Sequence, residues 1–345
     1  MIPTGLRGVG KTVLLNRVVE AARKQACAVA QIEASESGNF IAFLAADLRA
    51  VLLQMSARAH VKNGIQVALR ALRSFSTTQK LDSLSVTLGV DSEQGVADSG
   101  LLSTDLADLF VKLGEAAREE ETALLIAIDE LQYLKEEQLE ALIMAVHRIT
   151  QLQLPLLVIG AGLPQLPSLA GNAKSYAERL FDFPSVGALS REQAYEAIQG
   201  PAHTEGAAFE DAALRAIYDV TQGYPYFLQE WAYHAWNHAD TSPVTEEDIS
   251  SINAPVLARL DESFFRVRFD WLTPREKKYL RAMAQLGSGP HRSGDIAHLM
   301  EEKVQTLSPL RSTLIKKGMI FSPQHGDNSF TVPLFDQFMK RTMPF

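Results

Sequence analysis

The first twelve residues carry the pattern that most restricts how this chain can fold. Residues 5–12 read Gly5-Leu6-Arg7-Gly8-Val9-Gly10-Lys11-Thr12 and fit the pattern G-x-x-x-x-G-K-[ST]. Glycines in such a loop let the backbone turn tightly, so that consecutive N–H groups point toward one anion. Residues 13–19 then have the apolar spacing of a helix, whose positive end would face the same anion. The pattern therefore predicts a phosphate-binding loop (P-loop) between an extended segment, residues 2–4, and a helix.

The last two residues of this motif have separate chemical tasks. Lys11 would supply a positive charge to the β- and γ-phosphates, and Thr12 would supply a hydroxyl ligand for Mg²⁺. The alternative is a chance match in a glycine-rich turn, because the pattern fixes few positions. The extended segment before the loop and the helix after it favour the functional interpretation.

A second element that phosphate chemistry requires lies farther along the chain. Residues 122–128 form a continuous apolar run, typical of a central parallel strand covered on both faces. The run ends in Asp129-Glu130, where we expect Asp129 to hold Mg²⁺ and Glu130 to polarise the attacking water. Such a pair could also simply open a helix, but together with the P-loop it predicts nucleoside-triphosphate hydrolysis.

The next apolar run, residues 154–164, predicts another buried strand and ends in Gly160-Ala161-Gly162. Ligands bind at the carboxyl ends of parallel strands, so this turn is expected near the γ-phosphate, although no polar side chain is expected at the strand tip. The alternative is a plain tight turn. Arg179 follows, and it could form a surface salt bridge or act as an arginine finger on a neighbouring subunit. The residues alone leave both roles open.

Helical patterns fill the remainder of the first 270 residues. Residues 40–59, 65–75 and 106–118 read as helices and residues 83–88 as a strand, which predicts a helical insertion on an α/β core. Ser190 and Thr245 each begin a capping-type helix start. Gly223-Tyr224-Pro225 leads into another helix, with a proline at its first turn.

Composition excludes several classes of protein. With Cys27 as the one cysteine, neither an internal disulfide nor a cysteine-based zinc site can form, and a reducing cytoplasm is the expected compartment. The apolar runs at residues 124–128 and 154–163 fall well short of the ~20 residues of a membrane span. No basic segment followed by an apolar stretch opens the chain, so we expect no secretory signal and no membrane partner.

The charge of the chain is unevenly distributed. The whole sequence carries a net −8, which argues against a protein that coats nucleic acid. Residues 272–345 hold eleven Lys and Arg but six Asp and Glu, a balance of +5, which leaves −13 for the remainder. A basic terminal domain on an acidic body is therefore expected.

The terminal segment has the element order of a winged helix. Helices are predicted from Thr273 and Ser293 and over residues 308–318, followed by two short strands around Gly326-Asp327-Asn328. In a DNA-binding version the third helix enters the major groove, and Arg311, Lys316 and Lys317 would meet phosphates or base edges. The alternative is a protein-docking domain whose lysines merely favour the end of a helix.

These motifs together resemble the AAA+ and STAND group of P-loop ATPases, in particular the branch near the origin-recognition and archaeal initiator ATPases. The resemblance rests on the P-loop, on Leu-Leu-Ile-Ala-Ile-Asp-Glu-Leu-Gln, on Gly-Ala-Gly-Leu-Pro and on Gly-Tyr-Pro-Tyr-Phe-Leu-Gln, which stand in the family order. It implies an α/β fold: a P-loop parallel sheet flanked by helices (residues 1–188), an all-helical lid (189–270) and a winged-helix domain (271–345).

The resemblance also implies ATP and Mg²⁺ as cofactors. Carried over residue by residue, Lys11 and Thr12 hold phosphate and metal, while Asp129 and Glu130 hold metal and water. Gly223 and Pro225 open the lid helix that touches the nucleotide. The expected nucleotide contacts are Gly5, Arg7, Gly8, Val9, Gly10, Lys11, Thr12, Val13, Gly223 and Pro225.

Three departures from the family pattern modify this expectation. Gly160-Ala161-Gly162 stands where many relatives have a polar sensor residue, and Tyr226 stands where many have an arginine after the lid proline. Only Met1–Thr4 precede the P-loop, where relatives carry a segment that holds the base, so we expect either a start upstream or an incomplete base pocket.

The resulting expectation is a slow cytoplasmic ATPase that acts as a switch. ATP would close the lid and reposition the winged helix, which gates binding to duplex DNA, to a protein partner or to another copy of the chain. The alternative is a non-catalytic scaffold that ATP stabilises.

Overall fold

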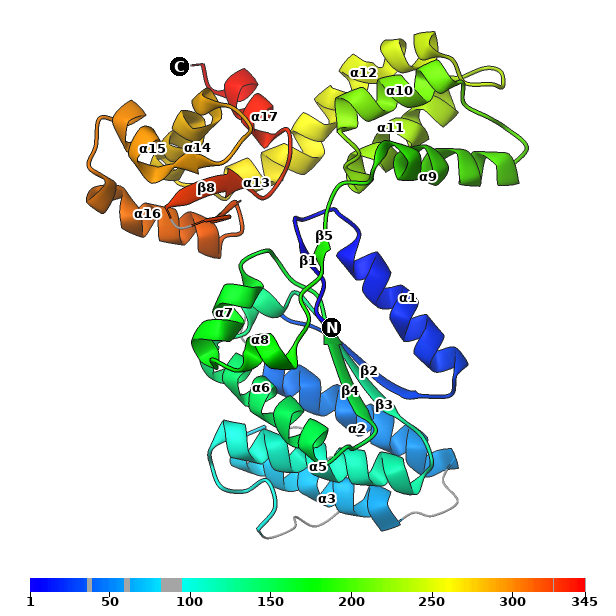
Figure 1. Ribbon diagram of the computed structural model, residues 1–345, viewed down its shortest axis with the longest axis vertical. Helices are drawn as coiled ribbons and strands as arrows, with labels where there is room; N and C mark the ends of the chain where they lie inside the picture. The colour runs from blue at the N-terminus through cyan, green and yellow to red at the C-terminus, as the bar shows by residue number, and fades with distance from the viewer. Residues whose placement is uncertain (36–38, 59–62, 82–94, 325, 345) are drawn as a thin grey trace. The chain divides into compact units, whose positions relative to one another are not determined.

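A computed structural model describes residues 1–345 except 36–38, 59–62, 82–94, 325 and 345 (Figure 1). The described chain divides into two compact units. Unit 1 comprises Met1–Thr4 and Lys11–Ser185, and unit 2 comprises Gly5–Gly10 and Val186–Phe345. The chain therefore passes between the units three times, and two of these passages bracket the glycines of the P-loop.

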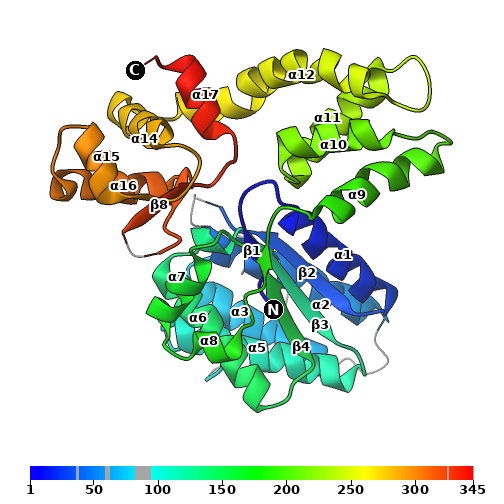
Figure 2. The ribbon, with the colours of Figure 1, turned by 45° about the horizontal axis from the view of Figure 1, so that its top comes forward.

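A parallel sheet forms the centre of unit 1 (Figure 2). Strands β2 (Ala28–Glu33), β3 (Leu124–Asp129) and β4 (Leu156–Gly160) pair side by side, with Ala28 opposite Leu124 and Leu124 opposite Leu156. All six residues of β3 are buried, which confirms the prediction of a central strand. The carboxyl ends of these strands lie at one edge of the sheet, as the βα connections require.

The first four residues extend this sheet. The backbone N–H groups of Gly160 and Gly162 donate to Met1 O and Pro3 O, at 3.4 and 3.1 Å. On the other side, Ile2 N donates to Asp182 O at 2.7 Å and Thr4 N donates to Pro184 O at 2.9 Å. Residues 1–4 therefore lie between β4 and residues 182–184, and the short strands β1 (Thr4–Gly5) and β5 (Ser185–Val186) pair where that ladder ends.

The two faces of the sheet bury alternate side chains. Leu124, Ile126 and Ile128 belong to a large apolar core, whereas Leu125 and Ala127 pack with α1 (Lys11–Lys24). This alternation follows from the period of two in a strand, and it places α1 on one face (Figure 1). The opposite face is covered by helices that also pack on one another: α2 (Phe40–Arg58), α3 (Asn63–Thr78), α5 (Leu102–Glu119) and α6 (Glu136–Gln151).

The helices predicted between the two motifs are confirmed by α2, α3 and α5, while the strand predicted at residues 83–88 lies outside the described residues. Residues 40–57 of α2 are long and apolar enough to cross a membrane by length and composition, which the sequence analysis did not anticipate. In the fold, Leu44, Leu48 and Leu52 of this helix are fully buried in the core of unit 1, so the apolar stretch has a packing explanation.

Unit 2 begins with four helices: α9 (Arg191–Thr204), α10 (Asp211–Thr221), α11 (Pro225–His238) and α12 (Glu246–Leu260). The predicted capping starts are confirmed. The side chains of Ser190 and Thr245 each accept a hydrogen bond from the backbone N–H of the third residue of their helix, and their own backbone N–H groups donate to the side chain of that residue. Pro225 opens α11 as predicted, since its missing N–H is not needed at a first turn.

The C-terminal part holds three helices, α14 (Pro274–Leu286), α15 (Ser293–Leu299) and α16 (Val304–Lys316). An antiparallel sheet in the order β6-β8-β7 accompanies them, formed by His291–Arg292, Asp327–Phe330 and Ile320–Phe321. The predicted start of the third helix at residue 308 is wrong, because α16 begins at Val304 and Pro309 lies inside it. A further helix, α17 (Phe335–Thr342), follows the sheet.

One long helical segment joins the two parts of unit 2. Helix α12 continues through a π-helical turn, η2 (Asp261–Phe265), into α13 (Arg266–Asp270). Arg341 of α17 holds this turn with two hydrogen bonds to the Asp261 carboxylate, at 2.6 and 3.0 Å. One apolar core contains residues from α9–α12 and from α14–α17, so the hydrophobic packing is continuous across residue 270.

Candidate functional site

The hydroxyl of Thr12 donates a hydrogen bond to Asp129 Oδ2 at 2.6 Å. Thr12 lies in the first turn of α1 and Asp129 ends β3, so the contact joins two motifs that are 117 residues apart. Asp129 is 8% exposed, and its position at the carboxyl end of the central strand follows from the parallel sheet. The fold therefore brings together the hydroxyl and the carboxylate that the sequence assigned to Mg²⁺.

The P-loop backbone has the conformation that its glycines permit. Gly8 has φ +83° and Gly10 has φ +90°, in the left-handed region that side chains rarely adopt. A Cβ at Gly10 would meet no atom within 4 Å, so that position requires glycine for its backbone angle rather than for space. Lys11 then begins α1 and is buried.

Glu130 occupies an unusual backbone position directly after β3. Its φ of 54° and ψ of 41° are left-handed, which costs about 1 kcal/mol or more for a residue with a side chain. Its N–H donates to Asp129 Oδ1 at 2.8 Å, so the carboxylate of one acidic residue fixes the backbone of the other. This sharp turn leads into η1 (Leu131–Tyr133).

Gln132 places a polar group at the tip of β4, where the sequence predicted none. Its side-chain amide donates through Nε2 to Glu130 Oε2, and its Oε1 accepts a hydrogen bond from Leu163 N at 3.0 Å. Gln132 thus joins the predicted catalytic carboxylate to the turn after β4. Sequence reasoning missed this residue because it looked for the polar group on β4 itself; the Gln in Asp129-Glu130-Leu131-Gln132 was the available signal.

The close approach of η1 and Leu166 to the end of β4 explains the glycines at positions 160 and 162. A Cβ at Gly160 would collide with the Leu131 side chain, and one at Gly162 would lie 2.7 Å from Leu166 and 3.0 Å from Gln132 Oε1. Leu131 N also donates to Ala161 O at 3.0 Å. Small residues at this turn therefore let η1 approach the strand tip closely.

The P-loop glycines also have neighbours within unit 2. Tyr226 N donates to Gly8 O at 3.2 Å, and a Cβ at Gly8 would lie 3.1 Å from Tyr226 Cβ. Gly223 has φ +73°, and a Cβ there would collide with Leu189 O. Gly223 and Pro225 thus form a tight entry into α11 beside residues 5–10. Their predicted contact with nucleotide stays a prediction.

Other predicted residues lie apart from this group or have partners of their own. Arg179 is exposed on the short helix α8 (Ala177–Leu180), and its role as a finger or a surface residue stays open. Arg311 donates to Asn328 Oδ1 at 2.6 Å and to Asp327 O, and Lys317 donates to Glu276 Oε2 at 2.8 Å.

These hydrogen bonds give Arg311 and Lys317 a packing role inside the C-terminal part, which the sequence analysis did not foresee. Lys316 is exposed on α16. The predicted contact of Lys316 with DNA stays a prediction.

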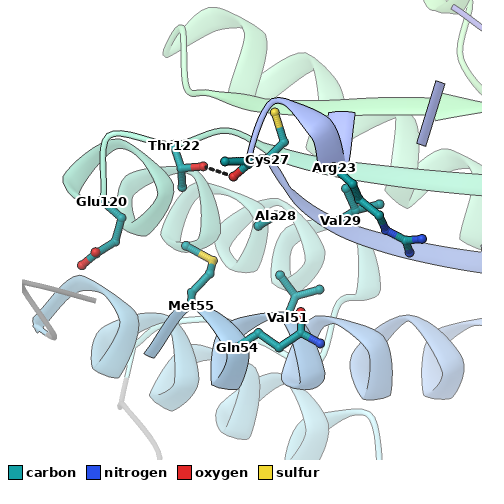
Figure 3. A pocket seen from close by; sticks show the side chains of 10 residues that line it. Arg23, Cys27, Ala28, Val29, Val51, Gln54, Met55, Glu120 and Thr122 are labelled. Atoms are coloured by element: carbon teal, nitrogen blue, oxygen red, sulfur yellow. Dashed lines mark hydrogen bonds between the residues drawn. The ribbon is translucent and has the colours of Figure 1, made fainter. Parts of the chain in front are cut away.

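A cavity of about 570 Å³ lies at the opposite edge of the sheet (Figure 3). Its lining includes Ala28 at the start of β2 and Thr122 just before β3, with Cys27, Met55 and Glu120 around them. Thr122 Oγ1 donates to Ala26 O at 3.2 Å, and this hydrogen bond joins the segments that precede β3 and β2. Because ligands of parallel sheets bind at the carboxyl ends of the strands, this cavity is not the candidate site.

The donor set at the carboxyl edge fits Mg²⁺ bound together with a nucleotide. Mg²⁺ prefers hydroxyl and carboxylate oxygens and is usually held by one or two carboxylates plus substrate phosphates. Thr12 and Asp129 supply that pair. Within the described ranges, no three His, Cys, Asp or Glu side chains group as metal ligands.

Comparisons with known proteins agree with this assignment of the core. Residues 4–159 match the family model of an AAA ATPase domain, and residues 262–339 match a domain of unknown function (DUF8462). No curated protein matches the chain. The AAA ATPase match supports a P-loop ATPase type of function for the α/β core.

Several solved structures are similar in fold. The Walker-type ATPase PABY2304 of Pyrococcus abyssi has 16% identity and a TM-score of 0.46, covering 99% of each chain. Cdc6p from Pyrobaculum aerophilum has 14% identity and a TM-score of 0.40, covering 99% of this chain and 87% of its own. The RuvB Holliday junction branch migration motor of Thermotoga maritima has 16% identity and a TM-score of 0.34, covering 70% and 84%. At these scores the solved structures say nothing of what this chain binds.

Proposed function

We propose that this chain is a cytoplasmic ATPase that binds ATP with Mg²⁺ and hydrolyses it slowly, as a switch. The observation that carries the proposal is the Thr12–Asp129 hydrogen bond, which unites the P-loop with the acidic strand at the carboxyl edge of a parallel sheet. The match of residues 4–159 to an AAA ATPase domain supports it independently.

The residues of the site divide the chemistry among them. Lys11 would bind the terminal phosphates as a positive charge, and Thr12 and Asp129 would hold Mg²⁺. When bound, Mg²⁺ would neutralise negative charge on the phosphate oxygens. Glu130 would orient the attacking water and take its proton, and the amide of Gln132 would hold the Glu130 carboxylate in place.

Steady-state ATP turnover of the purified full chain tests the proposal. We expect Mg²⁺-dependent turnover that falls about a hundredfold or more in Glu130→Gln, because a general base is removed, while ATP binding persists. Lys11→Ala should lose binding and turnover together. Lys24→Ala, at the exposed far end of α1, is the matched control and should behave as wild type. Equal turnover in wild type and Lys11→Ala would refute the proposal.

The alternative of an ATP-stabilised scaffold makes a different prediction. In that case wild type and Glu130→Gln both bind ATP, and neither turns it over above the Lys11→Ala blank. The ordered Glu130–Gln132 contact favours hydrolysis, because a scaffold has no need to fix that carboxylate in a costly backbone conformation.

We assign the output of the switch to the C-terminal part, which we interpret as a winged helix that contacts duplex DNA or a protein partner. Its +5 charge supports DNA, but the internal hydrogen bonds of Arg311 and Lys317 leave fewer free cations on α16 for phosphates. Turnover measured with and without duplex DNA decides between the two. Stimulation by DNA that weakens with salt supports DNA as the partner, and indifference to DNA supports a protein.

A further inference from the structure

A cavity of about 280 Å³ lies within the C-terminal part of unit 2. Its walls come from α14, α15 and α16 and from residues next to β7 and β8 (Figure 1). The volume is near the lower end of the ~300–1,000 Å³ that is usual for small-molecule sites, so the cavity suits a small ligand. Its lining includes Tyr279, Ser293, Val304, Leu307, Arg311 and Ser322.

Tyr279 brings a buried hydroxyl to the wall of this cavity. The residue is 1% exposed, and within the described part of the chain its hydroxyl has no hydrogen-bond partner. Burial raises the pKa of Tyr279 to about 12, while the positive charge of Arg311 acts in the opposite direction. The hydroxyl therefore stays protonated at neutral pH and can donate. Because a buried hydroxyl without a partner is costly, a ligand that accepts its hydrogen bond gains affinity.

Arg311 brings a positive charge that its neighbours hold in place. Its Nε donates to Asn328 Oδ1 at 2.6 Å, and its Nη2 donates to Ser322 Oγ at 2.8 Å and to Asp327 O at 3.0 Å. The buried Asn328 also donates to Ser293 Oγ at 3.0 Å, so one amide positions two residues of the cavity wall.

The partners of Arg311 leave its charge uncompensated. All three acceptors are neutral oxygens, and Nη1 takes part in none of these bonds. Among the residues that the structure describes, no carboxylate forms a salt bridge with Arg311. A guanidinium in this state attracts an anion, and a hydrogen bond between two charged groups is stronger than one between neutral groups.

The rest of the wall indicates which anion the cavity suits. The buried Leu307 and the exposed Val304 supply apolar surface from α16. Of the described residues that line the cavity, Arg311 alone carries a charge. One positive charge balances one negative charge, whereas a phosphate group carries about −1.5 to −2 at neutral pH. An apolar wall beside one guanidinium therefore fits a monocarboxylate with a short hydrocarbon part.

We propose that this cavity binds a small organic acid as its monocarboxylate, with Arg311 beside the carboxylate, the Tyr279 hydroxyl donating to it and Leu307 against the hydrocarbon part. The site lies within residues 262–339, which match a domain of unknown function, and none of its lining residues belongs to the P-loop. It does not rest on the ATPase function proposed above. It also gives Arg311 a role other than the DNA contact expected from the sequence.

Calorimetric titration of the full chain with butanoate tests the site, and butanamide is the neutral probe of nearly the same shape. We expect saturable binding of butanoate and none of butanamide, because only butanoate carries the charge that Arg311 attracts. In Tyr279→Phe the affinity for butanoate should fall about tenfold to a hundredfold, the usual effect of losing a hydrogen bond to a charged group. Tyr233→Phe, at an exposed tyrosine of α11, is the matched control and should bind as wild type does.

Melting temperatures separate binding from folding. Without ligand, Tyr279→Phe should melt no lower than wild type, because the change removes only a hydroxyl that lacks a partner among the described residues. Butanoate should raise the melting temperature of wild type more than that of Tyr279→Phe. Arg311→Lys should bind butanoate more weakly and also melt lower, since a lysine keeps the charge but loses the planar fork. Arg292→Lys, at an exposed arginine of β6, is its control.

Several results would overturn the proposal: no saturable binding of butanoate to wild type, equal affinity in wild type and Tyr279→Phe, or tighter binding of inorganic phosphate than of butanoate. Lys11→Ala tests the P-loop as the rival anion site. This variant should bind butanoate as wild type does, and loss of binding there would assign the anion to the P-loop instead. Absence of ATP turnover in wild type would refute the ATPase function alone and leave the butanoate results unaffected.

Discussion

Gln132 shows how much of the site depends on single residues in the turns after strands. Its amide has two ends, and each is used: one holds Glu130 and the other accepts from Leu163 N. A carboxylate held in this way keeps one orientation toward a bound water. Because Gln132 touches Glu130 and not the phosphates, it is a positioning residue whose loss should affect the rate and not the binding of ATP.

We expect Gln132→Ala to lower kcat about tenfold and to leave KM for ATP nearly unchanged, because only the orientation of the base is lost. Gln132→Glu should do more, since a second carboxylate beside Glu130 raises the pKa of the pair. Its activity should therefore recover as the pH rises from 6 to 8. Steady-state kinetics across this range measure both effects, with the exposed Gln151→Ala as control. A raised KM at constant kcat in Gln132→Ala would contradict this role.

At this scale the sequence predicts residues that are fixed by a motif and misses those fixed by a turn. Thr12 and Asp129 were expected at one site, and their 2.6 Å hydrogen bond confirms that expectation. Gln132 was not expected there. Its position depends on the left-handed backbone of Glu130, which has no local sequence signature.

The helix starts at Ser190, Thr245 and Thr273 were predictable because a cap is a local arrangement, whereas the start predicted at residue 308 was wrong. Thr273 accepts a hydrogen bond from Glu276 N at 3.3 Å, and the Glu276 carboxylate accepts one from Thr273 N at 2.7 Å. The contact of the same carboxylate with a residue far away in the sequence was not predictable. Lys317, 41 residues later, donates to Glu276 Oε2 at 2.8 Å and to Trp271 O at 3.0 Å, so the start of α14 is tied to the end of α16.

The Glu276 carboxylate makes the stability of this domain depend on pH. Burial acts to raise its pKa, but the hydrogen bonds from Lys317 and Thr273 outweigh it, and the pKa is lowered overall. A carboxylate with a lowered pKa stabilises the fold at pH values above its unfolded pKa of about 4.3. This stabilisation is lost as the pH falls through the pKa of the folded state. We therefore expect the unfolding free energy of wild type to fall more steeply than that of Glu276→Gln between pH 5 and pH 2.

Removing the other partner gives the complementary result. Lys317→Met leaves the Glu276 carboxylate with one donor fewer, and we expect a loss of about 2 kcal/mol at pH 7. Urea unfolding followed by tryptophan fluorescence measures it. Lys316→Met, one residue earlier and exposed, should cost little. Equal losses in the two variants would show that the pair contributes nothing specific.

Across the whole molecule, the P-loop contributes to both units. Gly5–Gly10 pack with unit 2, whereas Lys11 and Thr12 open the first helix of unit 1. The motif is therefore divided between the two units at the bond from Gly10 to Lys11. The sequence predicted the motif as part of the core alone, because the division follows from packing and not from the order of residues.

The chain carries a separate probe of nucleotide-dependent stability in each unit. All three tryptophans, Trp231, Trp236 and Trp271, belong to unit 2, and the one cysteine, Cys27, belongs to unit 1. At about a hundred times Kd, ATP with Mg²⁺ should stabilise the fold by about 2.7 kcal/mol and raise the thermal midpoint in both signals. Tryptophan fluorescence and the reactivity of the Cys27 thiol follow the two units. Lys11→Ala should show no rise in either signal, and a rise equal to that of wild type would contradict the predicted role of Lys11 in nucleotide binding.

The strand formed by residues 1–4 has a consequence for how this protein is made. Ile2 N donates to Asp182 O, and Asp182 is synthesised 180 residues after Ile2. At ~5–20 residues per second this interval is on the order of ten seconds or more, and contacts so distant in sequence form slowly. The P-loop follows directly on that strand. A nascent chain thus has this loop long before it can anchor the strand that precedes it, and translation products that end before Asp182 should not bind ATP.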